Sequence, residues 1–120
     1  MINIDDLDLV SVCEKGAEIT YKDDIKIKVL GPHAQQVRKA DIIYFRKMQS
    51  LGKQEHTDEE FAQGAEDYEI VRAAARIGGW SGIKQKYTAE LAEKLCKINP
   101  EIRAAVLKKH EELINFMKGK

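Results

Sequence analysis

The segment from residue 17 to residue 29 reads AEITYKDDIKIKV and decides how the first part of the chain folds. Apolar and polar residues alternate on both sides of its central Lys-Asp-Asp. Side chains of a strand point alternately to its two faces, so this period of two predicts a β-hairpin with one apolar face. Two strands are only marginally stable on their own. The apolar face is therefore expected to pack against helices or against another chain.

The period changes after Gly31-Pro32. Beyond this point apolar residues recur at three- and four-residue steps, which indicates amphipathic helices. Thr57-Asp58-Glu59-Glu60 predicts a capping box at a helix start. Gly78-Gly79 is expected to end that helix, because glycine readily takes the left-handed conformation of a C-terminal cap. Other boundaries are expected at Gly52, at Thr88 and at Asn99-Pro100, with Trp80 to Ile83 as a short connector.

These patterns predict a mainly α protein of the α+β class, in which an N-terminal β-hairpin is followed by about four packed helices. A chain of 120 residues can bury one core but does not comfortably form two domains. We expect a single domain over residues 1–120. Residues 1–31 would form an N-terminal arm and the hairpin, and residues 32–120 the helical part.

The charges balance, with 20 Lys and Arg against 20 Asp and Glu. Proteins that bind by neutralising phosphates usually carry a basic excess, so nucleic acid is not the expected partner. Zero net charge also means weak self-repulsion, which is compatible with a homo-oligomer.

The sequence also predicts a cytoplasmic protein without membrane contact. Cys13 and Cys96 lie far apart and lack a paired spacing, which fits a reducing compartment. The acidic N-terminus does not have the layout of a signal peptide. No apolar run approaches the roughly 20 residues that span a bilayer.

The motifs of catalysis and cofactor binding are absent from the sequence. His33, His56 and His110 stand at no metal-ligand spacing, and His110 is interpreted as a structural imidazole. Glycine-rich residues 78–82 lack the Lys-Ser/Thr ending of a phosphate loop, and Ser81 does not stand in a nucleophile elbow. We therefore expect no enzyme activity, no metal and no cofactor.

Binding of another protein is the function that remains. Trp80 is interpreted first as folding back onto the helix before it, with a partner-binding anchor as the alternative. A protein that binds partners through apolar helix faces needs apolar surface beyond its own core. The candidate partner-binding residues, each of which can also be explained as core, are Ile70, Ala74, Ile77, Trp80, Ile83, Phe116 and Met117.

The segment Gly78 to Ile83 resembles a turn in the tail assembly chaperones of long-tailed (siphovirus-type) phages and prophages, of the phage lambda G-protein type. The helix start at Thr88, the Pro-Glu-Ile-Arg step at residues 100–103 and the late Asn-Phe at 115–116 are similar too. The proline that these proteins often carry after the turn is missing from residues 84–87. The resemblance implies a chaperone that binds the tape measure protein, helps recruit tail tube protein and is absent from the mature virion.

The alternative is a small DNA-associated regulator. Its last two helices would form a helix-turn-helix with Asn99-Pro100 as the turn, and Arg103, Lys108 and Lys109 would face phosphate. The neutral charge and Glu111-Glu112 on the same helix weigh against this hypothesis.

Overall fold

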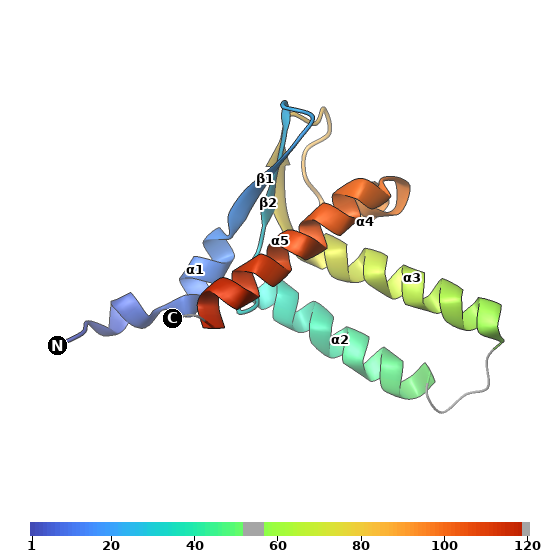
Figure 1. The fold of residues 1–120 in the computed structure, drawn as a ribbon, viewed down its shortest axis with the longest axis horizontal. Coiled ribbons are helices and arrows are strands. Elements are labelled where there is room, and N and C mark those ends of the chain that lie inside the picture. Colours follow the sequence, from blue (N-terminus) through green and yellow to red (C-terminus); the bar gives the residue numbers. More distant parts are fainter. Residues whose placement is uncertain (52–56, 119–120) are drawn as a thin grey trace.

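Helices and a small antiparallel sheet make up this chain, as predicted. The structure is a computed structural model that describes residues 1–51 and 57–118. Its elements in chain order (Figure 1) are the 3-10 helix η1 (Ile4–Leu7), α1 (Leu9–Lys15), β1 (Ala17–Tyr21), β2 (Ile25–Val29), α2 (Gln35–Leu51), α3 (Asp58–Ala75), β3 (Ile77–Ser81), α4 (Ala89–Ile98) and α5 (Pro100–Lys118).

The predicted hairpin is confirmed. Strands β1 and β2 pair antiparallel, with Ala17 opposite Val29 and Tyr21 opposite Ile25. Lys22 and Asp23 in the turn between them have positive φ values of 49° and 65°. Alternation along the strands directs one set of side chains towards the helices, and Ile27 and Val29 of that set are fully buried.

The prediction was wrong for residues 77–81, which form a third strand rather than a helix end and a connector. Strand β3 pairs with β2 in the sheet order β1-β2-β3, and Trp80 stands opposite Ile27. The helix before it ends at Ala75, with Arg76 as its cap in the right-handed region. Gly78-Gly79 is therefore part of the strand and not the cap. The free edge of β2 determines this pairing, and a five-residue strand with two glycines carries no period-two signal.

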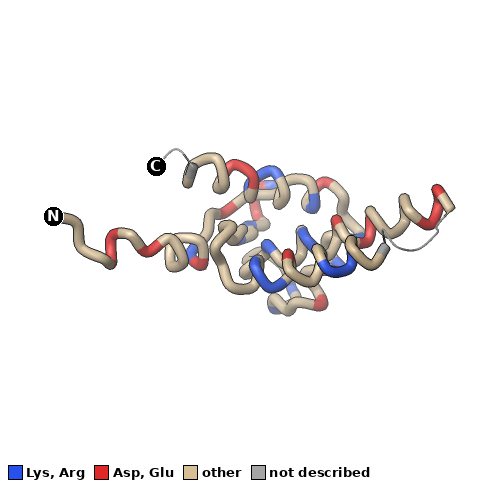
Figure 2. Tube along the Cα trace, turned by 90° about the horizontal axis from the view of Figure 1, so that it is seen from below, with Lys and Arg blue, Asp and Glu red and all other residues tan. Residues whose placement is uncertain are grey.

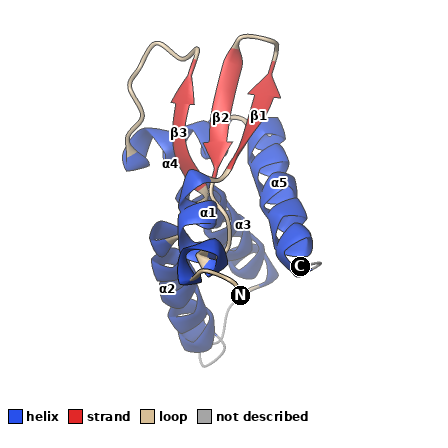
Figure 3. Cartoon of the chain, turned by 90° about the vertical axis from the view of Figure 1, so that its left-hand side faces the viewer, coloured by secondary structure: helices blue, strands red, loops and turns tan. Residues whose placement is uncertain are grey.

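Helices α3, α4 and α5 lie against one face of the sheet and form the main core with it (Figure 3). In the described part of the chain, no helix covers the opposite face of the sheet (Figure 3). The exposed residues Glu18 and Lys26, which alternate with the inward positions of β1 and β2, belong to that face. The buried residues of the main core are Ile27, Val29, Ile70, Ala73, Ala74, Ile77, Ala92, Cys96, Ile102 and Val106.

A second, smaller cluster joins α1, the β2–α2 connection and the end of α5. It consists of Cys13, Leu30, Ala34 and Val37, with Met117 packed against them. The backbone N–H of Gly31 donates to the carbonyl of Cys13 at 2.9 Å. The short α1 helix is therefore attached to the rest of the fold by the buried Cys13 side chain and by two hydrogen bonds from backbone N–H groups, the second from the Gln35 N–H to the Glu14 carboxylate at 2.7 Å.

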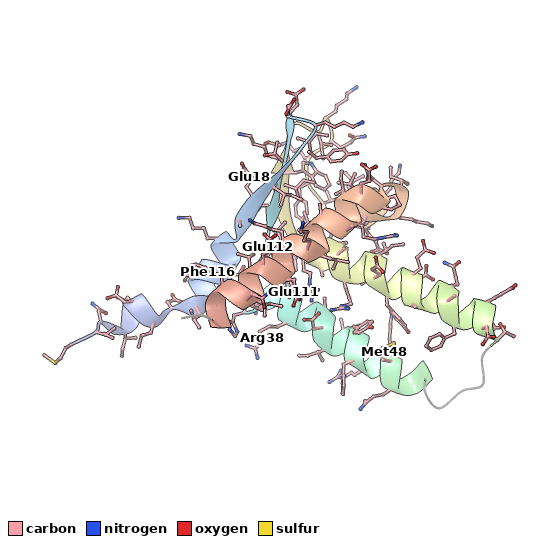
Figure 4. The ribbon with its side chains drawn as sticks, in the orientation of Figure 1. Glu18, Arg38, Met48, Glu111, Glu112 and Phe116 are labelled. Atoms are coloured by element: carbon pink, nitrogen blue, oxygen red, sulfur yellow. The ribbon has the colours of Figure 1, made fainter. Side chains whose placement is uncertain are left out.

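Helices α2 and α3 form a pair that extends away from the sheet (Figure 1). The Tyr44 and Tyr68 rings meet edge to face with centroids 5.3 Å apart, and Met48 points from α2 towards α3 (Figure 4). At the base of the pair, the Nη2 of buried Arg76 lies 3.0 and 3.2 Å from the two carboxylate oxygens of Asp41. This ion pair explains why an acidic residue interrupts the apolar stripe of α2.

The predicted helix starts are confirmed by their caps. The Thr57 hydroxyl accepts from the Glu60 N–H at 3.1 Å, and the Thr88 hydroxyl accepts from the Leu91 N–H at 3.1 Å. Asn99 accepts from the Ile102 N–H in the same way, which separates α4 from α5. The helix end expected at Gly52 lies outside the described residues.

The molecule is more open than a chain of its size requires. Its radius of gyration is 15.9 Å, whereas a compact domain of this length has about 14 Å. Its accessible surface is 8755 Å², against about 6,600 Å² for a compact monomer of the same mass. The excess of roughly 2,000 Å² is larger than the roughly 800 Å² that one partner buries in a standard-size protein–protein interface.

Candidate protein-binding surface

The seven predicted partner-binding residues do not form one surface. Ile70, Ala74 and Ile77 were expected to provide spare apolar surface on a helix, and for these three residues that expectation is wrong. They are 6%, 7% and 0% exposed and belong to the main core. The helix period identifies which residues share a face, but it does not show that the sheet covers this face. Ala74 still lines the floor of a groove between α2, α3 and α4.

Trp80 and Ile83 do lie together. They line a surface hollow of about 160 Å³, and the wall opposite them is formed by α4. Trp80 and Ile83 are half-buried, and Ile98 at the rim is 67% exposed. The full lining consists of Trp80, Ile83, Gln85, Leu91, Lys94, Leu95 and Ile98.

The chain around Trp80 folds back to hold the indole in place. Its Nε1–H donates to the carbonyl of Gln85 at 2.8 Å, and its ring meets Tyr87 edge to face at 5.2 Å. The Tyr87 hydroxyl in turn donates to the carbonyl of Ile77 at 2.8 Å. Both polar tips are thereby satisfied within the chain, so the apolar body of the indole can line the hollow without leaving an unpaired donor.

Gly82 makes this return of the chain possible. Its φ is +82°, in the region that glycine favours, and a Cβ at this position would collide with the backbone carbonyl of Asp24. The end of β3 therefore passes tightly against the β1–β2 turn before the chain crosses to α4. The Gly-Trp-Ser-Gly-Ile segment thus ends a strand, builds one wall of the hollow and contacts the hairpin.

The hollow has the character of an anchor site rather than a ligand cavity. Cavities for small molecules commonly measure 300–1,000 Å³, so about 160 Å³ has room for one or two apolar side chains. Interfaces concentrate binding energy in pockets of this kind around a few buried anchors. Lys94 supplies a cation at the rim, which suits an acidic residue next to the apolar anchor.

Phe116 and Met117 lie at the other end of the molecule, in the last turns of α5 (Figure 4). Phe116 is 58% exposed. Met117 is half-buried, and its sulfur lies 3.4 Å from the Sγ of Cys13. The structure therefore separates these two residues from the Trp80 hollow by most of the length of α5.

Exposed apolar side chains on α2 and α3 were missed in the sequence. Helix α2 buries Val37 and half-buries Tyr44, yet it also carries apolar residues on its outer side. A count of apolar positions all round this helix would have found them, since an ordinary surface helix has a polar outer face. The exposed large apolar residues of α2 and α3 are Ile42, Ile43, Phe45, Phe61 and Val71.

The titratable side chains of Cys96 and His110 are buried in the fold. Burial is the largest influence on Cys96 and raises the pKa of its thiol to about 11, so little nucleophilic thiolate forms at neutral pH. His110 is 4% exposed, and its Nδ1 lies 2.8 Å from the carbonyl oxygen of Leu30. Because that oxygen only accepts, Nδ1 carries the hydrogen and donates it. Within residues 1–51 and 57–118, His, Cys, Asp and Glu side chains form no group of three that could hold a metal ion.

Two side chains proposed for the DNA-binding alternative lie beside carboxylates of the same chain. The Arg103 guanidinium is 12% exposed and lies 3.8 and 3.3 Å from the carboxylates of Glu66 and Glu69. Lys109 lies 3.5 Å from the carboxylate of Glu112. Two of the three cations expected to face phosphate are therefore paired within the chain.

Comparisons with protein-family models, with curated proteins and with solved structures found no match to this chain. Among the helices of the described part, none is both long enough and apolar enough to cross a bilayer. What the chain binds is therefore inferred from its own residues and surfaces.

Proposed function

We propose that this chain is a tail assembly chaperone of a long-tailed phage or prophage. It binds the tape measure protein in the host cytoplasm, helps recruit tail tube protein around it and is absent from the finished virion. The observation that carries the proposal is the apolar hollow at Trp80. Trp80 and Ile83 in its wall belong to the segment, residues 78–83, that resembles this family.

The hollow suits a helical partner. Apolar anchors of an amphipathic helix recur at three- and four-residue steps, and one anchor would fill the space between Trp80 and Leu95. Ile98, on the next turn of α4, would cover a second anchor. A tape measure protein is a long helical chain that aggregates before the tube covers it, so capping its apolar residues keeps it soluble.

The openness of the molecule supports the same role. A catalytic domain needs one sheltered site, whereas a chaperone needs surface that is exposed when alone and buried when bound. The 8755 Å² of accessible surface exceeds that of a compact monomer by more than the roughly 800 Å² that one partner buries in a standard-size interface.

Co-expression with the tape measure protein tests the proposal. The bait is the tape measure protein, which this proposal expects to be a long coiled-coil-rich protein encoded immediately downstream. The readouts are its soluble fraction and its co-purification with the full-length chain. We expect the wild-type chain to raise the soluble fraction several-fold. Ile98→Glu would place a charge at the rim of the hollow and should remove at least about 90% of the co-purified protein, a loss of roughly 1.4 kcal/mol in binding.

Phe61→Glu is the matched control, because Phe61 is 59% exposed and lies at the start of α3, in the half of the α2–α3 pair away from the sheet. It should leave co-purification unchanged. Equal loss in both variants would show that the hollow is not the binding site. No effect of the wild-type chain on the solubility of the downstream protein would refute the proposed function itself.

A further inference from the structure

The N-terminal arm, residues 1–8, contains apolar side chains, and every one of its residues is exposed on the described part of the chain. Helix η1 has no buried residue, and the arm projects from the body of the molecule (Figure 1). Its large apolar residues are 63% exposed or more, namely Met1, Ile2, Ile4 and Leu7. Four exposed large apolar side chains within eight residues are unusual for a protein that functions as a monomer.

The arm is also acidic, whereas the outer side of α2 is basic. Residues 1–14 contain four acidic and no basic side chains: Asp5, Asp6, Asp8 and Glu14. Helix α2 contains four basic side chains, and its single acidic residue, Asp41, is occupied by Arg76. Figure 2 shows these acidic positions along the arm and the basic positions along α2.

Apolar side chains lie next to the basic residues on the outer side of α2. A hollow of about 410 Å³ lies between α1 and the first turns of α2, with Val10, Arg38, Lys39 and Ile42 among its lining residues. Phe45 follows Ile42 by three residues and so lies next to it on the helix surface. Ile42 is 51% and Phe45 63% exposed.

The spacing of the arm matches this surface. Residues three apart in a 3-10 helix lie on the same side, so Ile4 and Leu7 of η1 form one apolar edge. Ile42 and Phe45 form an edge with the same three-residue step on α2. Asp5 and Asp6 lie between Ile4 and Leu7 in the arm. On α2, Arg38 and Lys39 lie one turn before Ile42.

We propose that the arm of one copy of this chain docks on the outer face of α2 in a second copy. Ile4 and Leu7 would lie against Ile42 and Phe45, and Asp5 and Asp6 would face Arg38 and Lys39. The arm leads away from the α2 helix of its own chain (Figure 1), so the acceptor is a neighbouring copy. Each copy offers one arm and one acceptor face, and a reciprocal exchange between two copies satisfies both.

This inference does not rest on the proposed function, because it is measured on the isolated chain. Light scattering coupled to size exclusion, between about 5 and 200 µM because association depends on concentration, should give at least twice the 13.6 kDa of one copy. Two charge reversals should each return the mass to that of a monomer. One is Asp5→Lys with Asp6→Lys, and the other is Arg38→Glu with Lys39→Glu.

Mixing the two charge-reversed proteins provides the decisive measurement. The basic arm of the first fits the acidic α2 of the second, and the wild-type arm of the second fits the wild-type α2 of the first. The mixture should therefore regain the dimer mass, with an affinity at least about tenfold above that of either protein alone. All four positions are exposed, so circular dichroism of both variants should match the wild type.

Three results would overturn the inference. The first is a wild-type chain that stays monomeric, whether its arm is free or folds back. The second is an oligomer that both charge reversals leave intact, which would place the contact elsewhere. The third is a mixture of the two variants that remains monomeric. Ile98→Glu should leave the oligomer mass unchanged, so loss of tape measure binding and loss of self-association can be distinguished.

Discussion

Gly82 stands immediately after β3, where the chain turns against the hairpin. Its φ of +82° and the Asp24 carbonyl beside it leave no space for a side chain. Gly79, three residues earlier in the same segment, has no neighbouring atom within 4 Å of where a Cβ would lie. The two glycines of the Gly-Trp-Ser-Gly segment therefore have different roles, which only the structure distinguishes.

We predict that Gly82→Ala lowers the free energy of unfolding by about 2 kcal/mol or more, because it adds backbone strain and a collision at the hairpin. Gly79→Ala is the matched variant and should change it by less than about 1 kcal/mol. Urea unfolding followed by Trp80 fluorescence measures both. Equal destabilisation by the two substitutions would contradict the role assigned to Gly82.

His110 makes stability depend on pH. Burial, the largest influence, lowers its pKa below the ordinary value of 6.5, and the hydrogen bond to Leu30 opposes this shift. Below pH 6.5 the unfolded chain therefore binds a proton that the folded chain does not, so the free energy of unfolding falls as the pH drops from 6.5 to the folded-state pKa.

His110→Phe should flatten this decline between pH 6.5 and pH 5. It should also cost about 1–3 kcal/mol at pH 7.5, because the Leu30 carbonyl loses its donor. Urea titrations at several pH values provide the test. His33→Gln, which changes an exposed imidazole, is the control variant for the loss of a histidine. A His110→Phe slope as steep as that of the wild type would assign the decline to other groups.

At the scale of elements, the predictable features were those encoded locally. The alternation of residues 17–29 and the side-chain caps of Thr57 and Thr88 act within a few residues, and the structure confirms them. Strand β3 depends on an edge provided by β2, about 50 residues earlier in the chain. Ile70 is buried in a core that includes residues of the same sheet, so the local sequence pattern could not predict its burial either.

The cap of α4 connects element stability to the candidate site. Helix α4 has only 10 residues and forms one wall of the Trp80 hollow. Thr88→Ala removes the acceptor for the Leu91 N–H and should destabilise the protein by about 1 kcal/mol. Thr88→Ser keeps an acceptor and should recover most of that loss in thermal or urea unfolding. If Thr88→Ser were as unstable as Thr88→Ala, the methyl group rather than the cap would be responsible.

At the scale of the whole molecule, the sequence predicted the α+β class but not the open shape. The spacing of apolar residues identifies helices, whereas the base of the α2–α3 pair is joined by Arg76 and Asp41, which are 35 residues apart in the chain. Of the predicted binding residues, the structure brings Trp80 and Ile83 into one hollow and places three others in the core. Which apolar face becomes core is decided by long-range packing.

The two buried clusters predict different thiol reactivities for Cys13 and Cys96. Both side chains are 0% exposed. Cys13 is the only buried residue of the seven-residue helix α1, so undocking this helix exposes it at little cost. Cys96 lies in the main core together with residues of β2, α3 and α5, and its raised pKa slows its reaction further.

We expect Cys13 to react with a thiol reagent at least about tenfold faster than Cys96 under native conditions. Cys96→Ala and Cys13→Ala variants report each thiol separately. Dilute urea should accelerate Cys96 strongly and Cys13 little, because a local opening exposes less surface than a large one. This difference in urea dependence separates opening from thiol pKa, which urea changes little. If both thiols showed the same steep urea dependence, the two clusters would unfold together, and α1 would be an integral part of a single cooperative core.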